Sequence, residues 1–201
     1  MNQVTSQATN KVIVNSIVSV DGYTEGPGGN VMAMPMDHAF DEHNAERMRA
    51  AGSLLLGATT YRGFVGFWPT ALDLPGLSPG STEIAQRYAD GIPITVVSDT
   101  LTEDETGPWR DQTTMVRRAD AHEAVARLRE RDGDDAVTFG SRTLWTDLLA
   151  HGLVDELRLM VGPSLVAGDH HAFAGVPAAG LRLLDVRRWD GSDNVLLRYA
   201  V

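Results

Sequence analysis

Three apolar segments of the sequence each end at a short turn of small or polar residues, and this pattern limits the possible folds more than any other. They are SLLLG at 53–57, PITVVS at 93–98 and AVTFG at 136–140. Short apolar runs that are bounded by turn residues predict buried strands. Because helix-like segments separate these runs, we expect an α/β fold in which ligands bind where the strands end.

The other segments extend this prediction. KVIVNSIV at 11–18 predicts a strand, and the glycine-rich loop at 19–30 is flexible by composition. A further strand is expected at 113–118, and helices are expected at 37–51, 60–68, 81–90, 121–133 and 141–152. The helix at 37–51 has Asp37 at its start and Gly52 just beyond, whereas a Ser/Thr cap opens the helix at 81–90.

The last third of the chain lacks a helical period. Its apolar segments, 154–166, 181–189 and 194–201, predict antiparallel strands that close one edge of the sheet. The chain is therefore expected to form a single α/β domain over residues 11–201, with a mixed, mostly parallel sheet and flanking helices. Residues 1–10 are polar and predict a loose tail.

Composition excludes several classes of protein. The formal charge of −10, with dispersed cations, argues against a nucleic-acid surface and favours a small-molecule partner. No cysteine is present, which excludes disulfides and thiol chemistry. No apolar run approaches the ~20 residues that a membrane helix needs. Because the first residues also lack the pattern of a signal peptide, we expect a cytoplasmic protein.

The turns that follow the three apolar strands carry groups that suit phosphate. Gly57 would let a ligand approach the backbone, and Thr59 and Thr60 could cap a helix or bind a phosphate. Gly140 and Ser141 precede a helix whose free N–H groups attract anions, and Arg142 adds a cation. The third turn is VSDT at 97–100. Each turn taken alone is more typical of an ordinary turn and cap, but the recurrence after three apolar strands favours a ligand site.

Four motifs in order together resemble the dihydrofolate-reductase fold, and most of all its bacterial RibD C-terminal-domain branch, the reductase of riboflavin synthesis. They are SIVSVDGYTEGPGG, SLLLGATTYRGFVGFWP, ITVVSDTLTED and VTFGSRTLWTDLLAHGLVDELRLMVGPSLV, and the resemblance covers about residues 11–200. It implies a three-layer fold and a pyridine-nucleotide reductase that typically uses NADPH and is often a homodimer.

The resemblance also implies which residues bind the dinucleotide. Gly57 and Thr60 match the glycine and threonine of the turn that meets the pyrophosphate, and Ser98 matches a serine near the adenosine 2′-phosphate. The second phosphate turn is matched by Gly140, Ser141 and Arg142. The remaining candidates for the cofactor site are Ser19, Thr59, Asp99 and Thr143.

Two positions depart from the family pattern. Ala58 replaces the arginine that usually pairs with the 2′-phosphate, and Asp99 stands where a basic or neutral residue is common. Loss of a charge-assisted contact costs about 1.5–3 kcal/mol. Three alternatives follow: preference for NADH with Asp99 on the ribose 2′-hydroxyl, an NADPH site rebuilt from Arg117 or Arg118, or loss of the dinucleotide. The acidic residue favours the first alternative over the second.

Two carboxylates are the candidate catalytic residues. Asp21 ends the first strand, and Asp37 lies where dihydrofolate reductases carry the acid that holds and helps protonate the pterin. Asp37 would then relay a proton to the substrate, or it would serve only as a helix N-cap. Folate itself is not the expected substrate, because the first loop lacks the tryptophan of the family.

The remaining histidine, methionine and serine residues do not indicate a further site of known chemistry. His38 and His43 are five residues apart and do not share a helix face, so no metal site is expected there or at His170 and His171. The methionines at 32, 34 and 36 could line an apolar pocket. No serine has the context of a hydrolase nucleophile.

These predictions leave three functions open. The leading one is hydride transfer from NAD(P)H to a C=N or C=O bond of a small, cyclic substrate. The second is a non-redox step, such as a cyclisation or an isomerisation, by a protein that has dropped the dinucleotide. The third is ligand binding without turnover. A fold alone does not choose among them.

Overall fold

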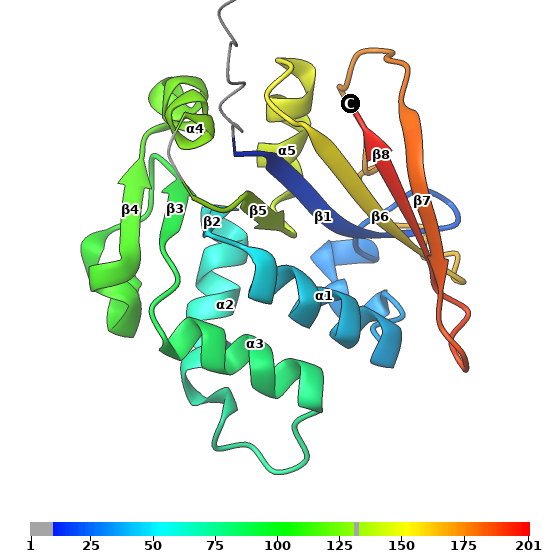
Figure 1. Cartoon of the computed structure of the whole chain (residues 1–201), viewed down its shortest axis with the longest axis horizontal. Coiled ribbons are helices and arrows are strands. Elements are labelled where there is room, and N and C mark those ends of the chain that lie inside the picture. Colours follow the sequence, from blue (N-terminus) through cyan, green and yellow to red (C-terminus); the bar gives the residue numbers. More distant parts are fainter. Residues whose placement is uncertain (1–9, 131–132) are drawn as a thin grey trace, which may run out of the picture.

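One eight-stranded sheet runs through the computed structural model, which describes residues 10–130 and 133–201 (Figure 1). The strand order across it is β4-β3-β2-β5-β1-β6-β8-β7. The strands are β1 (Val12–Ser19), β2 (Ser53–Gly57), β3 (Ile94–Val97), β4 (Thr113–Val116), β5 (Ala136–Phe139), β6 (Glu156–Gly162), β7 (Arg182–Arg188) and β8 (Val195–Ala200). The sheet is mixed and mostly parallel, which confirms the predicted fold class.

Five α-helices flank the sheet in two layers. They are α1 (His38–Ala50), α2 (Ala58–Ala71), α3 (Pro79–Ala89), α4 (Ala121–Arg129) and α5 (Arg142–Ala150). Side chains alternate between the faces of a strand, so Leu54 and Leu56 pack with α1, α2 and α3, whereas Leu55 packs with α4 and α5. The buried strands therefore have a helical layer on each face, as expected of a three-layer fold.

The last three strands close one edge of the sheet in the order β6-β8-β7 and pair antiparallel with one another, as expected. The β6 strand also pairs with β1 on its other side, and this pairing is parallel. The physical reason is the α5 helix between β5 and β6, because a helical crossover returns the chain in the same direction.

Two helix starts differ from the predicted ones. The α2 helix begins at Ala58 with Gly57 as its N-cap, so Thr59 and Thr60 lie in its first turn and do not cap it. The α3 helix begins at Pro79, and its cap is Ser78, whose Oγ accepts a hydrogen bond from the Ser81 N–H at 3.0 Å. Proline suits a first helical position because the missing N–H would have no partner there.

The α1 helix has the predicted limits, but Gly52 does not act as its C-terminal cap. Asp37 caps its start, but the residue after its end, Ala51, is extended, and Gly52 has no left-handed φ. A Cβ at Gly52 would lie 2.6 Å from the Asp134 carbonyl oxygen. Close contact between two chain segments therefore explains this glycine, and helix capping does not.

The loops contain short 3-10 segments that the sequence did not predict. The glycine-rich loop contains short 3-10 turns at Pro27–Gly29 and Val31–Ala33, and the Gly28 N–H donates to Asp169 at 2.7 Å. A 3-10 segment at Glu103–Gln112 precedes β4 and was not expected. Most of the predicted tail, residues 1–9, lies outside the described residues. Among the described helices, none combines the length and apolar character needed to cross a membrane.

Candidate functional site

The three turns singled out from the sequence lie at one edge of the sheet. Strands β3, β2 and β5 are adjacent and parallel, so Val97, Gly57 and Phe139 end at the same side. The turns that follow therefore meet there, at the edge where ligands bind in α/β proteins.

The turn after β5 is built on two consecutive left-handed residues. Gly140 has φ 53°, and Ser141 has φ 53° and ψ 37°. A Cβ at Gly140 would lie 3.0 Å from Thr60 Oγ1, so the position suits only glycine. Ser141 carries a side chain in a conformation that costs about 1–2 kcal/mol. Its hydrogen bonds to the α2 turn stabilise this conformation.

Those hydrogen bonds join the β2 and β5 turns in both directions. The Ser141 N–H donates to Thr60 Oγ1 at 2.8 Å, and Ser141 Oγ accepts from the Gly57 N–H at 3.0 Å. Each hydroxyl uses its oxygen as an acceptor and so keeps its own proton to donate elsewhere. The two turns consequently form one unit with two hydroxyl donors.

This unit holds the N-termini of two helices, α2 and α5. The first N–H groups of an α-helix have no partner within the helix, and no side chain caps the start of α2 or of α5. The half-buried Arg142 side chain makes no ion pair with any described residue. The free groups are therefore donors and one cation, which is the chemistry that binds an anion such as a pyrophosphate.

No steric conflict within the protein explains Gly57. A Cβ there would meet Ser141 only at 3.9 Å, an ordinary van der Waals contact. Its φ of −87° is also open to any residue. A glycine that the fold does not require is consistent with the predicted close approach of a ligand to this backbone.

The third turn uses its polar groups internally. Ser98 Oγ accepts from the N–H groups of Thr100 and Leu101 at 3.0 and 2.9 Å. Asp99 Oδ1 accepts from the Arg118 N–H at 3.1 Å, and its other oxygen lies 3.9 Å from the Arg118 side chain. Arg117 is exposed and forms no ion pair with the residues described. Of the two arginines considered for a 2′-phosphate clamp, Arg118 thus lies beside Asp99 in space and is partly neutralised by it.

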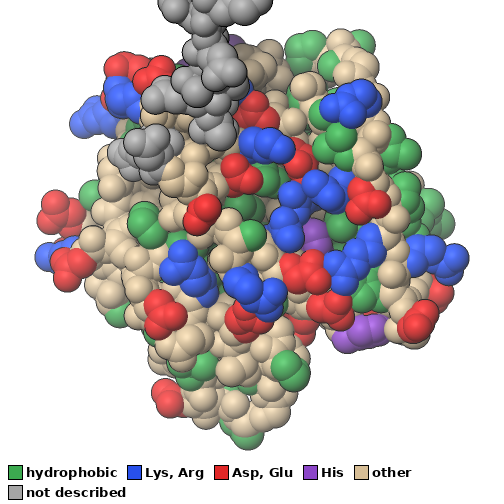
Figure 2. All heavy atoms as spheres, in the orientation of Figure 1, with side chains coloured by type: hydrophobic (Ala, Val, Ile, Leu, Met, Phe, Trp, Pro, Cys, Tyr) green, Lys and Arg blue, Asp and Glu red, His purple; other side chains and the backbone are tan. Residues whose placement is uncertain are grey.

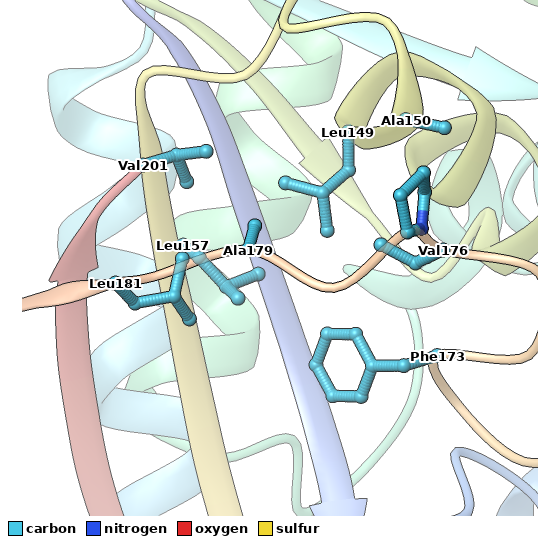
Figure 3. Close-up of a pocket in the computed structure, with 9 residues that line it drawn as sticks. Leu149, Ala150, Leu157, Phe173, Val176, Ala179, Leu181 and Val201 are labelled. Atoms are coloured by element: carbon cyan, nitrogen blue, oxygen red, sulfur yellow. The ribbon is translucent and has the colours of Figure 1, made fainter.

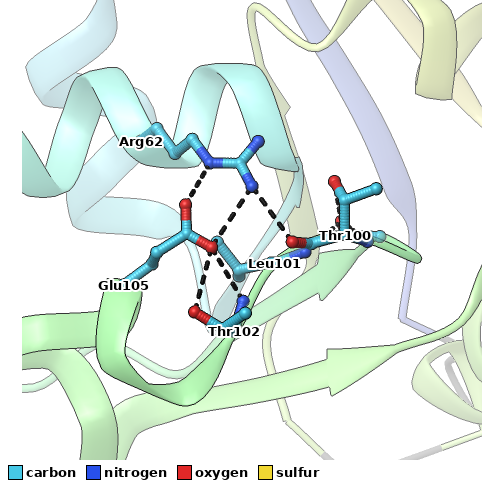
Figure 4. A network of polar contacts seen from close by, with 6 residues as sticks. Arg62, Thr100, Leu101, Thr102 and Glu105 are labelled. Carbon is cyan, nitrogen blue, oxygen red and sulfur yellow. Dashed lines mark hydrogen bonds and ion pairs between the residues drawn. The ribbon is translucent and has the colours of Figure 1, made fainter.

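A third arginine close to this turn was missed from the sequence. Arg62 on α2 donates to the Thr100 carbonyl at 3.3 Å and to Glu105 at 2.6 and 3.3 Å (Figure 4). The Arg62 hydrogen bond, helped by the Thr102 N–H, lowers the pKa of Glu105 to about 2. The 62–105 spacing carries no local signal, because the contact depends on how α2 packs against the 3-10 segment.

The candidate acid Asp21 holds a neighbouring loop. Its carboxylate accepts from the N–H groups of Val166 and Ala167 at 3.1 and 2.9 Å, and Ala167 has a left-handed φ of 48°. The Ser19 hydroxyl and these two N–H groups keep the pKa of Asp21 below its usual value. Ser19 is buried and accepts from the Tyr23 N–H at 3.0 Å. Both residues lie at the end of β1, on the same edge as the three turns.

The candidate acid Asp37 makes the contacts of a helix cap. Its Oδ1 accepts from the Ala39 and Phe40 N–H groups at 3.0 and 3.3 Å. Ser192 and Asn194 donate to the carboxylate at 2.6 and 2.8 Å. Burial raises its pKa, but these hydrogen bonds outweigh burial, and the net pKa is lowered. The geometry fits the capping alternative, and proton donation by Asp37 stays a prediction.

A buried polar group under α1 was also missed. His43 Nε2 lies 2.7 Å from Asn15 Oδ1, and Asn15 Nδ2 donates to Asn44 at 2.7 Å. Burial, together with the nearby positive charge of Arg47 and other arginines, lowers the pKa of His43 to about 3. The polar Asn15 within an apolar strand was the available signal. Figure 2 shows Lys/Arg and Asp/Glu side chains intermixed between α1 and β8.

The expected methionine pocket does not form from all three residues. Met34 is buried against Ile17 and Leu196, whereas Met32 and Met36 are exposed. An apolar cavity of about 300 Å³ lies elsewhere, between the end of α5, the start of β6 and the segment around Phe173 (Figure 3). It is lined by Leu149, Ala150, Leu157, Phe173, Val176, Pro177, Ala179, Leu181 and Val201. The sheet edge that carries the three turns is at the other end of β6.

Solved structures with this fold include reductases. A putative riboflavin biosynthesis protein from Shewanella sp. PV-4 is 18% identical, with a TM-score of 0.64 over 94% of this chain and 98% of that one. A Thermotoga maritima diaminohydroxyphosphoribosylaminopyrimidine deaminase/5-amino-6-(5-phosphoribosylamino)uracil reductase is 14% identical (TM-score 0.63; 96% of this chain, 56% of that one). Enterococcus faecalis dihydrofolate reductase, complexed with NADP(H) and RAB-propyl, is 13% identical (TM-score 0.56; 94% and 95%).

The sheet order, the two helical layers and these neighbours define a protein of the dihydrofolate-reductase-like fold. The sequence profile of the RibD C-terminal domain matches residues 10–196, which is most of the chain. The chain therefore belongs to the RibD C-terminal domain family. No curated protein matches it in sequence.

Proposed function

We propose that this protein is a pyridine-nucleotide-dependent reductase acting on a C=N or C=O bond of a small cyclic substrate. The observation that carries the proposal is the joined pair of turns, in which Thr60 and Ser141 bind each other and leave the N-termini of α2 and α5 open. Membership of the RibD C-terminal domain family and the reductases among its structural neighbours support the same activity.

The chain's own groups suit the diphosphate of such a cofactor. The free N–H groups at Arg142 and Thr143, the hydroxyls of Thr60 and Ser141 and the Arg142 cation would hold it. When bound, the reduced nicotinamide supplies the hydride. Asp21, at the end of β1, and Asp37, before α1, would orient the substrate as hydrogen-bond acceptors.

We propose NADH as the preferred nucleotide. Asp99 already accepts from the Arg118 backbone and faces its side chain, so a 2′-phosphate would meet a carboxylate there. Arg62 is held by Glu105, and Ala58 provides no cation. A ribose 2′-hydroxyl would instead find an acceptor in Asp99, as in other folds that bind NAD.

Calorimetric titration with NADH and NADPH tests the proposal, after mass spectrometry has shown that no ligand is carried over. We expect micromolar binding of at least one nucleotide, and about 10-fold or greater weakening in Arg142→Gln through loss of a charge-assisted contact. Arg49→Gln is the matched control, because Arg49 pairs with Glu83 on the helical layer. Absence of binding to the folded, empty protein would contradict the proposal and favour a non-redox role.

We also propose a homodimer through the outer part of the sheet. Leu183 and Val186 on β7 pair with Tyr199 and Leu197 and are about half exposed, at 52% and 50%. Figure 2 shows hydrophobic side chains along the outer edge of β7. An exposed apolar surface of this kind is typical of an interface. Light scattering should give a dimer that Val186→Arg dissociates, whereas Met115→Arg on β4 leaves it intact; a monomeric wild type would contradict the proposal.

A further inference from the structure

Two histidines and an aspartate from α4 and the end of α5 converge on the outer surface of the α4–α5 layer. His122 is the second residue of α4, Asp147 lies on α5, and His151 directly follows α5. His122 Nε2 is 2.7 Å from Asp147 Oδ2, and His151 Nδ1 is 3.4 Å from Asp147 Oδ1. The two imidazole rings are 4.1 Å apart between centroids. The i, i+4 spacing of Asp147 and His151 was a local signal, but no local spacing linked His122 to them.

We propose that this cluster binds a divalent transition-metal ion, with zinc as the best match. The three residues can each offer one ligand atom, and these atoms lie within 4.8 Å of one another. Two ligands of a tetrahedral zinc ion are about 3.4 Å apart, given metal–ligand distances of about 2.1 Å. Small side-chain rotations therefore bring all three atoms into range.

The chemistry of the donors supports a metal over a simple ion pair. Imidazole nitrogen and carboxylate oxygen are common zinc ligands, and softer thiolates are not required. Within residues 10–130 and 133–201, no lysine or arginine pairs with the Asp147 carboxylate, which contacts only the two imidazoles. A divalent cation would neutralise this carboxylate while both imidazoles stay uncharged.

The surroundings leave room for an ion and for water. The side chains of His122, Asp147 and His151 are 44%, 47% and 52% exposed. Three protein ligands leave a fourth position for solvent. The ion would link α4 to the end of α5, the helix whose start forms the Arg142 turn. Its expected role is therefore to stabilise the helical layer behind the site.

Zinc titration of the metal-free protein, carrying no histidine tag, tests the proposal. We expect one ion per chain with micromolar or tighter affinity at neutral pH, and at least 10-fold weaker binding in His151→Gln, His122→Gln and Asp147→Asn. A zinc concentration one hundred times Kd should raise Tm by about 5–10 °C. Binding should weaken near pH 5, because protons compete for the imidazoles.

His38→Gln is the matched control, since it removes an exposed histidine that contacts the Asp190 carbonyl instead. It should bind zinc as the wild type does. Cobalt gives a second readout, because four-coordinate Co²⁺ absorbs visible light much more strongly than the six-coordinate hydrated ion. Equal zinc affinity in His38→Gln and His151→Gln, or no stoichiometric binding to the wild type, would overturn the proposal.

Discussion

Thr60 and Ser141, which are 81 residues apart, join two turns of the sheet edge through the 2.8 Å hydrogen bond from the Ser141 N–H to Thr60 Oγ1. The bond in the other direction, from the Gly57 N–H to Ser141 Oγ, closes the pair. Ser141 is held in a left-handed conformation by these contacts. The N-terminus of α5 is thereby fixed beside that of α2, and both helix dipoles favour an anion at the same place.

Replacement of Thr60 by valine should therefore loosen the site. The variant keeps the shape of the side chain but leaves the Ser141 N–H without its acceptor, which costs about 1–2 kcal/mol. Urea unfolding should show this loss, and dinucleotide affinity should fall by about 10-fold or more. Thr60→Ser retains the hydroxyl and should behave nearly as the wild type. A fully stable Thr60→Val protein would show that the bond is dispensable.

Nucleotide preference should respond to Ala58 and Asp99. The double variant Ala58→Arg/Asp99→Ser adds a cation and removes a carboxylate beside the proposed 2′-phosphate position. Its NADPH affinity should rise by about 10-fold or more relative to NADH, because a charge-assisted contact is worth about 1.5–3 kcal/mol. Calorimetry with both nucleotides measures the ratio. An unchanged ratio would mean that the adenosine ribose lies elsewhere.

Replacement of Asp37 should lower the stability of the folded protein. Asp37→Ala removes the acceptor for two N–H groups of α1 and for Ser192 and Asn194, and should lower the free energy of unfolding by about 1–2 kcal/mol. Asp37→Asn keeps a capping oxygen and should cost less. Denaturant unfolding of the two variants makes the comparison. Equal losses in both would show that the charge, and not the cap, dominates.

The buried His43 should make stability depend on pH. Its pKa is about 3 in the folded protein, and histidine titrates near 6.5 when unfolded. Between these values only the unfolded chain takes up the proton, so stability decreases as the pH falls from about 6.5 towards 3, by up to about 1.4 kcal/mol per pH unit. The His43→Gln variant has no titratable group at this position. The difference between the unfolding free energies of the wild type and this variant, measured against pH, should therefore give the contribution of His43. The same pH dependence of stability in both proteins would contradict this prediction.

Much of the fold was predictable because local patterns agree with it. The apolar runs at β2, β3 and β5 and the Asp37 cap follow from strand and helix signals in the sequence itself. The parallel pairing of β6 with β1 did not follow from such signals, because it depends on where a helical crossover returns the chain. Gly52 looked like a helix end but reflects close packing on Asp134.

The candidate site was predictable only in part. Gly140, Ser141 and Arg142 were found from a glycine and hydroxyl between a strand and a helix. The hydrogen bond between Ser141 and Thr60 could not be predicted from local sequence, because it depends on β2 and β5 lying side by side. The Arg62–Glu105 pair and the His122–Asp147–His151 cluster have the same origin, in the packing of distant elements.

The most direct test of the central claim is the change in backbone amide NMR shifts when NADH or NADPH is added to the isotope-labelled protein. The account predicts that the largest changes fall on residues 57–60 and 139–143, with smaller ones at 98–100, and that Arg142→Gln diminishes them. Saturable changes confined to other residues, or no changes at all, would contradict the claim that the joined turns bind a dinucleotide.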